Sequence, residues 1–235
     1  MHNNIIAREG WPFIIFFALI TFLLLWISWY KLAIAASILT VFCLYFFRNP
    51  ERKVNEDKDL VLAPADGRIM EINTVWEDQY LQAKTIQLRI FLNLFNVHVN
   101  RCPMAGTIEW VNRKGGLFLP AFKKEAGEKN ARNYVGLLSE YGRILVVQIT
   151  GLIARRIVCW VNPGDTLNAG ERIGLIRFGS CTELYLPLEA EVLVVPGQKV
   201  KGGETIVARF NPAVSESGNT NRRRDDEKNS KTGQE

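Results

Sequence analysis

Hydrophobic and polar positions divide this chain of 235 residues into three parts. Residues 11–47 are almost wholly apolar, and residues 214–235 are almost wholly polar. Between them, short apolar segments alternate with Gly, Pro, Asn and Asp clusters, as β-strands joined by turns do. The pattern predicts a membrane hairpin over residues 1–47, a β-rich domain over residues 48–212 and a disordered polar tail over residues 213–235.

The apolar run is too long for one typical transmembrane helix, which needs about 20 apolar residues. Trp11–Ser28 and Leu32–Phe47 each approach that length. The stretch Trp29–Lys31 between them combines two amphipathic rings with a cation, a composition typical of a membrane surface. We therefore predict a transmembrane helical hairpin, with one long tilted span as the alternative. A signal peptide is disfavoured, because no small-residue cleavage site follows the run.

Basic residues flank the hairpin on both sides. Arg8 precedes it, and Arg48, Arg52 and Lys53 follow it. Because Lys and Arg are enriched on the cytoplasmic side of membrane helices, both ends are expected in the cytoplasm. The β-rich domain would then face the cytoplasm from the cell (inner) membrane, whereas a single span would put it on the other side.

The soluble part is expected to be mainly β, as a sandwich or partly closed barrel. Helix or loop is expected only over residues 120–135, which carry a dense charge pattern. The candidate strands are Arg68–Val75, Thr85–Leu92, Thr107–Val111, Ile144–Thr150, Ile157–Trp160, Arg172–Phe178, Thr182–Leu186, Glu191–Val195 and Ile206–Phe210.

Two turn motifs occur twice in this region. The pattern P-G-x-x-[LV]-x-x-G-E-x-I spans residues 163–173 and 196–206, and the turn at residues 64–69 is echoed at 103–108. Such paired turns resemble the barrel-sandwich hybrid of lipoyl-type domains. They keep open a rival interpretation, a non-catalytic membrane-anchored lipoyl-like adaptor, although a carrier lysine flanked by Asp or Met at a hairpin tip is not seen.

Charge and cysteine content narrow the classes of function. The formal net charge is +5, which suits a surface of anionic lipid. Nucleic-acid binding is not expected, because no such motif accompanies the membrane segment. The four cysteines have no CxxC spacing and the histidines are only His2 and His98, so we expect reduced thiols and no metal site.

One histidine and one carboxylate are the first candidates for chemistry. His98 stands among Asn96, Asn100 and Arg101 after an apolar strand, and its imidazole suits proton transfer near neutral pH. A lone histidine in a β protein is nevertheless more often structural. Asp66 lies in a turn, where an aspartate commonly bonds its own backbone, but a carboxylate can also orient an imidazole.

A candidate nucleophile lies in the stretch 178–181. Ser180 follows Gly179, and a Gly-Ser pair alone is usually only a turn. Without a Cβ, however, Gly179 admits strained geometry and close approach to its carbonyl group.

Taken together, these motifs resemble the phosphatidylserine decarboxylase family, in its shorter branch with an N-terminal membrane hairpin. The resemblance rests on Pro64–Ile69, Asn96–Arg101 and Phe178–Ser180 in this order, with the stretch Lys123–Asn133 in agreement, and it covers residues 48–212.

The resemblance implies a self-processing enzyme. Ser180 would attack the carbonyl of Gly179, with His98 as base and Asp66 as its orienting anion. Cleavage between them would give fragments 1–179 and 180–235, which remain together as a heterodimer. Ser180 would become a covalent pyruvoyl group that forms a Schiff base with phosphatidylserine, and the products would be phosphatidylethanolamine and carbon dioxide. The sequence leaves homo-oligomers open, and also a pyruvoyl enzyme with another amino-acid-derived substrate.

Two departures from the longer family members stand out. Arg101 occupies the place of a second histidine, so His98 would serve both self-cleavage and decarboxylation. Cys181 follows the Gly-Ser pair where the longer branch resembles L-G-S-T. Finally, an apolar-basic stretch is expected either to dip into lipid or to be a solvated loop; it comprises Phe118, Leu119, Phe122, Lys123 and Lys124.

Overall fold

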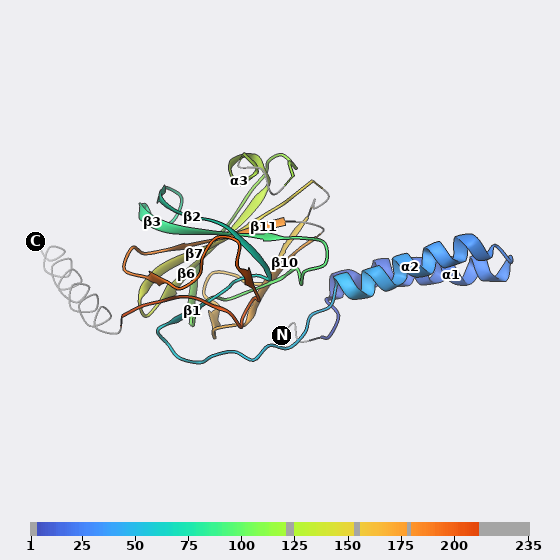
Figure 1. Cartoon of the computed structure of the whole chain (residues 1–235), viewed down its shortest axis with the longest axis horizontal. Coiled ribbons are helices and arrows are strands. Elements are labelled where there is room, and N and C mark those ends of the chain that lie inside the picture. The colour runs from blue at the N-terminus through green and yellow to red at the C-terminus, as the bar shows by residue number, and fades with distance from the viewer. Residues whose placement is uncertain (1–3, 121–124, 153–155, 178–179, 212–235) are drawn as a thin grey trace, which may run out of the picture.

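Two apolar helices form the N-terminal part of the chain. The 3-10 helix η1 (Arg8–Gly10) leads into α1 (Trp11–Trp26), and α2 (Tyr30–Phe46) returns beside it (Figure 1). By length and composition Arg8–Trp26 is able to cross a membrane, and α2 is a shorter apolar helix. The predicted helix pair is thus confirmed.

The computed structural model describes residues 4–120, 125–152, 156–177 and 180–211. Its soluble part is mainly β, as expected, and the described strands pair antiparallel, whereas the isolated bridge between Leu117 and Asn130 is parallel. Residues 213–235, the predicted tail, lie outside the described residues. The strands are β1 (Leu60–Leu62), β2 (Gly67–Glu77), β3 (Ala83–Leu92), β4 (Val99–Arg101), β5 (Gly106–Lys114), β6 (Arg132–Ser139), β7 (Gly142–Ile149), β8 (Ile157–Cys159), β9 (Thr166–Leu167), β10 (Arg172–Ile176), β11 (Ser180–Leu186), β12 (Glu191–Val192), β13 (Lys199–Val200) and β14 (Ile206–Arg209).

In the described part of the chain the strands form one large sheet and two small ones. The large sheet has the order β13-β2-β3-β11-β7-β6-β5-β9, and the small sheets are β1-β14-β12 and β4-β10-β8. A single apolar cluster joins residues of the large sheet, such as Leu88 and Leu184, to residues of the small sheets, such as Val207 and Ile173. The small sheets therefore cover the inner face of the large one.

The repeated turns of the sequence adopt matching geometry. Gly164 and Gly197 occupy equivalent positions with φ of 97° and 90°, and Gly170 and Gly203 both have φ of 76°. These left-handed conformations favour glycine, because a Cβ would be strained there. The copies feed β9 and β13, which lie at opposite edges of the large sheet.

The other pair of echoed turns is joined by reciprocal hydrogen bonds. The Leu62 N–H donates to the Pro103 carbonyl, and the Arg101 N–H donates to the Pro64 carbonyl, both at 2.8 Å. The two echoed turns therefore lie side by side, and the turn that carries Asp66 lies against strand β4.

One expectation is wrong in part. Residues 120–135 were expected to be helix or loop, but β6 begins at Arg132 and pairs with both β5 and β7. The short helix α3 (Ala126–Lys129) is the described helical piece of this stretch. The start of β6 was not predicted because residues 125–132 are rich in charge. The inward positions of this strand are Asn133, Val135 and Leu137.

The hairpin is docked on the β domain through its base. The Ala7 N–H donates to the Phe47 carbonyl at 2.9 Å, and the Asn49 N–H donates to the Ile5 carbonyl at 2.7 Å. The indole N–H of Trp160 reaches Glu9 at 2.9 Å. Both chain segments at the hairpin base are therefore fixed, one against the other and against the β domain.

Candidate active site

Ser180 is the first residue of β11, in the interior of the large sheet. It pairs with Leu92 at the end of β3, and the following residue, Cys181, pairs with Ile149 of β7. Ser180 is 0% exposed, and among the described residues its hydroxyl has no hydrogen-bond partner. A buried hydroxyl without a structural hydrogen bond is unusual, because burial of an unsatisfied polar group costs about 1–3 kcal/mol. Phe178 and Gly179, which precede it, lie outside the described residues.

His98 is buried at the same end of the domain. It precedes β4, and its carbonyl accepts the Ile176 N–H at 3.2 Å, at the end of the strand that leads toward Ser180. Its Nδ1 lies 2.9 Å from the Asn96 carbonyl oxygen. Because a carbonyl oxygen only accepts, Nδ1 carries the proton and Nε2 is left with the lone pair.

The imidazole of His98 is held neutral. Burial lowers its pKa to about 4, and the positive charge of Arg48 lowers it too, against the opposing effect of the Asn96 hydrogen bond. An imidazole that is neutral at pH 7 is in its basic form rather than its acidic form.

Asn100 links the strand after His98 to the strand that Ser180 begins. Its side-chain amide donates to the Thr182 hydroxyl at 3.1 Å, two residues beyond Ser180. Its carbonyl accepts from Gln148 at 2.7 Å, and Gln148 in turn accepts from Asn133 at 2.9 Å. This fully buried chain of side chains spans the space between a small sheet and the large one.

The inner face of the large sheet changes from apolar to polar at this end. Thr182, Gln148 and Asn133 are cross-strand neighbours on β11, β7 and β6. The next inward positions along the same strands are Leu184, Val146 and Val135, which belong to the apolar core. The polar row therefore marks where the core ends and the candidate site begins.

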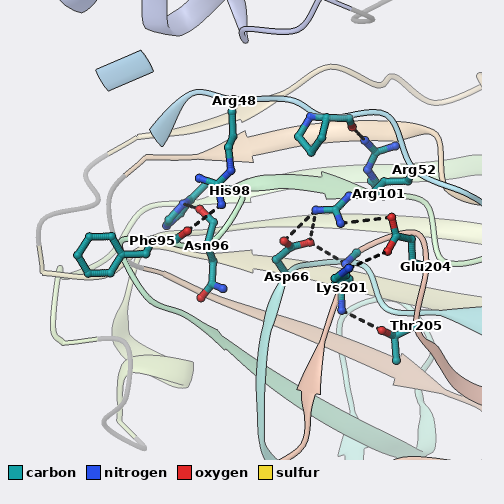
Figure 2. Close-up of polar contacts among 12 residues, drawn as sticks. Arg48, Arg52, Asp66, Phe95, Asn96, His98, Arg101, Lys201, Glu204 and Thr205 are labelled. Carbon is teal, nitrogen blue, oxygen red and sulfur yellow. Dashed lines mark hydrogen bonds and ion pairs between the residues drawn. The ribbon is translucent and has the colours of Figure 1, made fainter. Parts of the chain in front are cut away.

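Asp66 makes contacts other than the predicted one with His98. Its carboxylate accepts both hydrogen bonds of the terminal Arg52 nitrogen at 2.9 Å and the Gly202 N–H at 2.8 Å. Figure 2 shows His98 with Asn96 in one group and Asp66 with Arg52 in another. The imidazole Nδ1 thus contacts the Asn96 carbonyl, whereas Asp66 was expected to orient this imidazole.

Arg101 occupies the position of a second histidine in longer family members. Its side chain holds two backbone segments together. Its guanidinium donates to the carbonyl oxygens of Gly170 at 2.8 Å and Pro50 at 2.7 Å. Burial, followed by the nearby charges of Arg172 and Arg52, lowers its pKa to about 10, so it remains charged at pH 7. It joins the segment after the hairpin to the β domain.

The buried side-chain amide of Asn130 holds part of the apolar-basic stretch near the end of the β domain that carries Ser180. The Asn130 side chain accepts the Leu119 N–H and donates to the carbonyl oxygens of Leu119 and Thr150, each at 2.8 Å. Thr150 directly follows β7, whose last residue pairs with Cys181. Phe118 is partly exposed, whereas Phe122, Lys123 and Lys124 lie outside the described residues.

The sequence interpretation did not single out Thr182, Gln148 or Arg52. For Gln148 and Thr182 a signal existed, because each interrupts the alternation of inward apolar residues on its strand. Arg52 was noted only as a flanking charge, and no local pattern predicts that it pairs with Asp66.

The site fits a group made from the Ser180 side chain. The hydroxyl is at a strand start, enclosed, and not held by a hydrogen bond among the described residues. A neutral imidazole lies by the neighbouring strand end, and an apolar hairpin is docked alongside. These features define a mainly β protein with an N-terminal pair of apolar helices and a buried, serine-centred candidate site.

Comparison with known proteins agrees. A family model described as phosphatidylserine decarboxylase matches residues 39–208. The chain is 46% identical to the phosphatidylserine decarboxylase proenzyme of Carboxydothermus hydrogenoformans, over 88% of this chain and 97% of that protein. The proenzyme of Symbiobacterium thermophilum is 45% identical, over 89% and 98%. The chain belongs to the phosphatidylserine decarboxylase family and is a decarboxylase of the lyase class.

Proposed function

We propose that this chain is a proenzyme that cleaves itself between Gly179 and Ser180 and then converts phosphatidylserine to phosphatidylethanolamine and carbon dioxide. The observation that carries the proposal is the buried Ser180 hydroxyl, uncommitted among the described residues, at the end of the domain where His98 is held neutral. Family membership supplies the substrate class.

Self-cleavage needs a base for the serine hydroxyl. In the proposed step, the Ser180 oxygen bonds to the Gly179 carbonyl carbon, the peptide C–N bond breaks, and the hydroxyl proton passes by way of His98 to the freed amine. Loss of the Ser180 α-proton then breaks the Cβ–O bond and releases a chain that ends in the Gly179 carboxylate. Water converts the remaining enamine to a ketone and releases ammonia.

The hydrogen bond at Asn96 suits His98 for this role. It fixes the proton on Nδ1, so that Nε2 presents its lone pair, as the third member of a catalytic triad does for its histidine. With a pKa of about 4, the imidazole is in its basic form across the neutral range.

In the mature enzyme the pyruvoyl group derived from Ser180 would supply a carbonyl able to take up the electron pair left when carbon dioxide departs. His98 would accept a proton from the ammonium group of the substrate. The same imidazole would return a proton to the carbon that loses the carboxylate. One histidine thereby covers both stages, since the buried Arg101 is engaged with two backbone carbonyls.

Asp66 is proposed to position His98 indirectly, through the residues that it contacts. Its carboxylate fixes Arg52, which belongs to the segment after the hairpin, and its turn accepts the Arg101 N–H through Pro64. The turn and the strand after His98 therefore share one hydrogen-bonded frame, and Asp66 is a positioning residue within it.

The hairpin is proposed to anchor the enzyme in the cell (inner) membrane with its β domain on the cytoplasmic side. Arg8 and Arg48 flank the helices on that side. The two fragments, 1–179 and 180–235, would stay together as a heterodimer, because β11 lies between β3 and β7 of the first fragment. The exposed Phe95 and Leu152 favour contact with lipid near the site.

The test is a denaturing gel of purified full-length protein, mass spectrometry of residues 180–235, and carbon dioxide release from phosphatidylserine in mixed micelles. We expect two fragments, a blocked pyruvoyl N-terminus, and activity. Ser180→Ala should remain one chain without activity. Ser139→Ala is the matched control, because that buried hydroxyl already donates to the Gly142 carbonyl and should not affect cleavage.

Each rival makes a different prediction. A lipoyl-like adaptor gives one intact chain and releases no carbon dioxide. A pyruvoyl enzyme with another substrate is cleaved but leaves phosphatidylserine unchanged. Cleavage that persists in Ser180→Ala would contradict the proposed cofactor source.

A further inference from the structure

The membrane hairpin packs directly on the strands that carry the candidate site. A distinct apolar cluster, separate from the main core, joins the hairpin base to β4, β10 and the residues before β4. Its buried members are Ala7, Ile14, Cys43, Phe46, Phe47, Val97, Val99 and Leu175. The hairpin is therefore packed against the β domain and not joined to it by a flexible linker alone.

Within this cluster, Phe46 lies on the imidazole of His98. The ring centroids are 4.3 Å apart with the planes tilted by 34°, and the Phe46 side chain is 0% exposed. Phe46 is the last residue of α2. The hairpin therefore ends against the proposed base.

Arg48, which follows α2, also lies near this histidine. Arg48 donates to the Tyr45 carbonyl and to the Phe95 carbonyl, each at 2.8 Å, and so joins the hairpin end to the loop that precedes His98. Figure 2 shows Arg48 beside His98 and Asn96. The imidazole thus has an apolar ring and a fixed cation on the hairpin side.

We propose that Phe46 is a positioning residue for His98, so that the membrane hairpin is a structural part of the catalytic centre as well as its anchor. The inference rests on the proposed role of His98. Phe46 excludes water from the imidazole and fixes its plane, while Arg48 disfavours its protonation.

The titratable groups around His98 allow a specific test. Arg48, from the segment after α2, is the charged group that acts on the pKa of His98, and Cys43 of α2 belongs to the same apolar cluster as Phe46. Burial is the largest cause of the low pKa of His98, and Arg48 adds to it. If Phe46 provides that burial, truncating its ring admits water and moves the pKa toward the ordinary value of about 6.5.

The experiment is a histidine-selective ¹⁵N NMR titration of full-length Ser180→Ala protein in detergent micelles. The chain has only two histidines, and a His98→Gln spectrum identifies the other one, His2. We expect His98 to stay neutral down to about pH 5 and its pKa to rise by one unit or more in Phe46→Ala. Phe46→Leu, which keeps more apolar volume, should give a smaller rise and serves if the alanine variant does not fold.

Phe47→Ala is the matched control. Phe47 is equally buried in the same cluster, where its ring stacks on Phe13 at 5.7 Å and meets Phe46 edge-on at 5.0 Å, whereas the ring contact with His98 is made by Phe46. It should leave the His98 titration within a few tenths of a unit. Equal shifts in the two alanine variants, or none in either, would overturn the inference. These readouts do not depend on cleavage, so failure of the proposed function would appear separately on the denaturing gel.

Discussion

At the scale of single residues, the sequence predicted candidate catalytic side chains but not the contacts that they make. Ser180 and His98 stood out by type and neighbourhood, and the structure brings their chain segments to one end of the β domain. The partner of His98 at Nδ1, a backbone carbonyl, has no sequence signature. Asp66 was predictable as a special turn residue, but its pairing with Arg52 depends on how the hairpin docks.

Asn100 provides the first test at this scale. Replacement by Ala leaves Gln148 and Thr182 without their shared partner and should lower the free energy of unfolding by about 1–3 kcal/mol. Because the link between the two strands is lost, self-cleavage should slow by roughly tenfold or more. Denaturant unfolding of the Ser180→Ala background and the cleavage half-time measure the two effects. Asn73→Ala, at an exposed asparagine, should alter neither.

The buried His98 also predicts a pH dependence of stability. Its folded-state pKa of about 4 lies below the unfolded value of about 6.5, so the unfolded chain binds the extra proton as the pH falls. The histidine therefore costs no stability above pH 6.5 and destabilises the fold increasingly between pH 6.5 and 4, by about 2 kcal/mol at pH 5. Unfolding of Ser180→Ala protein at pH 7 and pH 5 tests this. His98→Gln should weaken the difference, and an unchanged difference would contradict it.

At the scale of elements, alternation and turn residues predicted long strands well. Candidate strands overlap β2, β3, β5, β7 and β11, and the paired glycine turns have matching φ angles. The strands that were missed are short or begin within charged sequence, as β4 and β6 do. Three-residue strands such as β1 exist because a neighbour supplies hydrogen bonds, which the local sequence cannot reveal.

The ion pair between Arg52 and Asp66 is a test at the scale of elements, because it joins the segment after α2 to the turn before β2. Both side chains are nearly buried, at 8% and 13% exposure. Asp66→Asn leaves the Arg52 charge with only its longer pair to Glu204, at 3.4 Å, and should lower the free energy of unfolding by about 3 kcal/mol. Glu109→Gln, which breaks the more exposed pair with Arg143, should cost less than about 1 kcal/mol. Equal losses in the two variants would refute a structural role for the buried pair.

At the scale of the whole molecule, the helix pair and the β domain were predictable as separate parts, but their contact was not. The apolar sequence of the hairpin would be the same whether its base packed on the β domain or not, so the sequence does not predict this contact. The docking depends on Phe46 and Phe47 meeting Val99 and Leu175, a match between distant segments.

This docking predicts which end of the β domain touches lipid. Phe95, 65% exposed, lies in the loop that Arg48 ties to the hairpin, whereas Trp76, 68% exposed, is close to the β2–β3 turn at the other end of β3. A bimane label at Phe95→Cys should be quenched by doxyl lipids in phosphatidylserine-containing vesicles, and one at Trp76→Cys should not. Stronger quenching at position 76 would reverse the proposed orientation.

The position of Ser180 at the start of β11 has a consequence for the lifetime of the enzyme. A cut before it would leave a second chain that contributes β11 to the interior of the large sheet, β13 to its edge and β14 to the middle of a small sheet. The precursor folds as one molecule, but the cut protein, once unfolded, would have to reassemble from two. Its persistence would then depend on how slowly it unfolds rather than on a reversible folding equilibrium. The intact precursor would be the only form from which the native arrangement is readily reached.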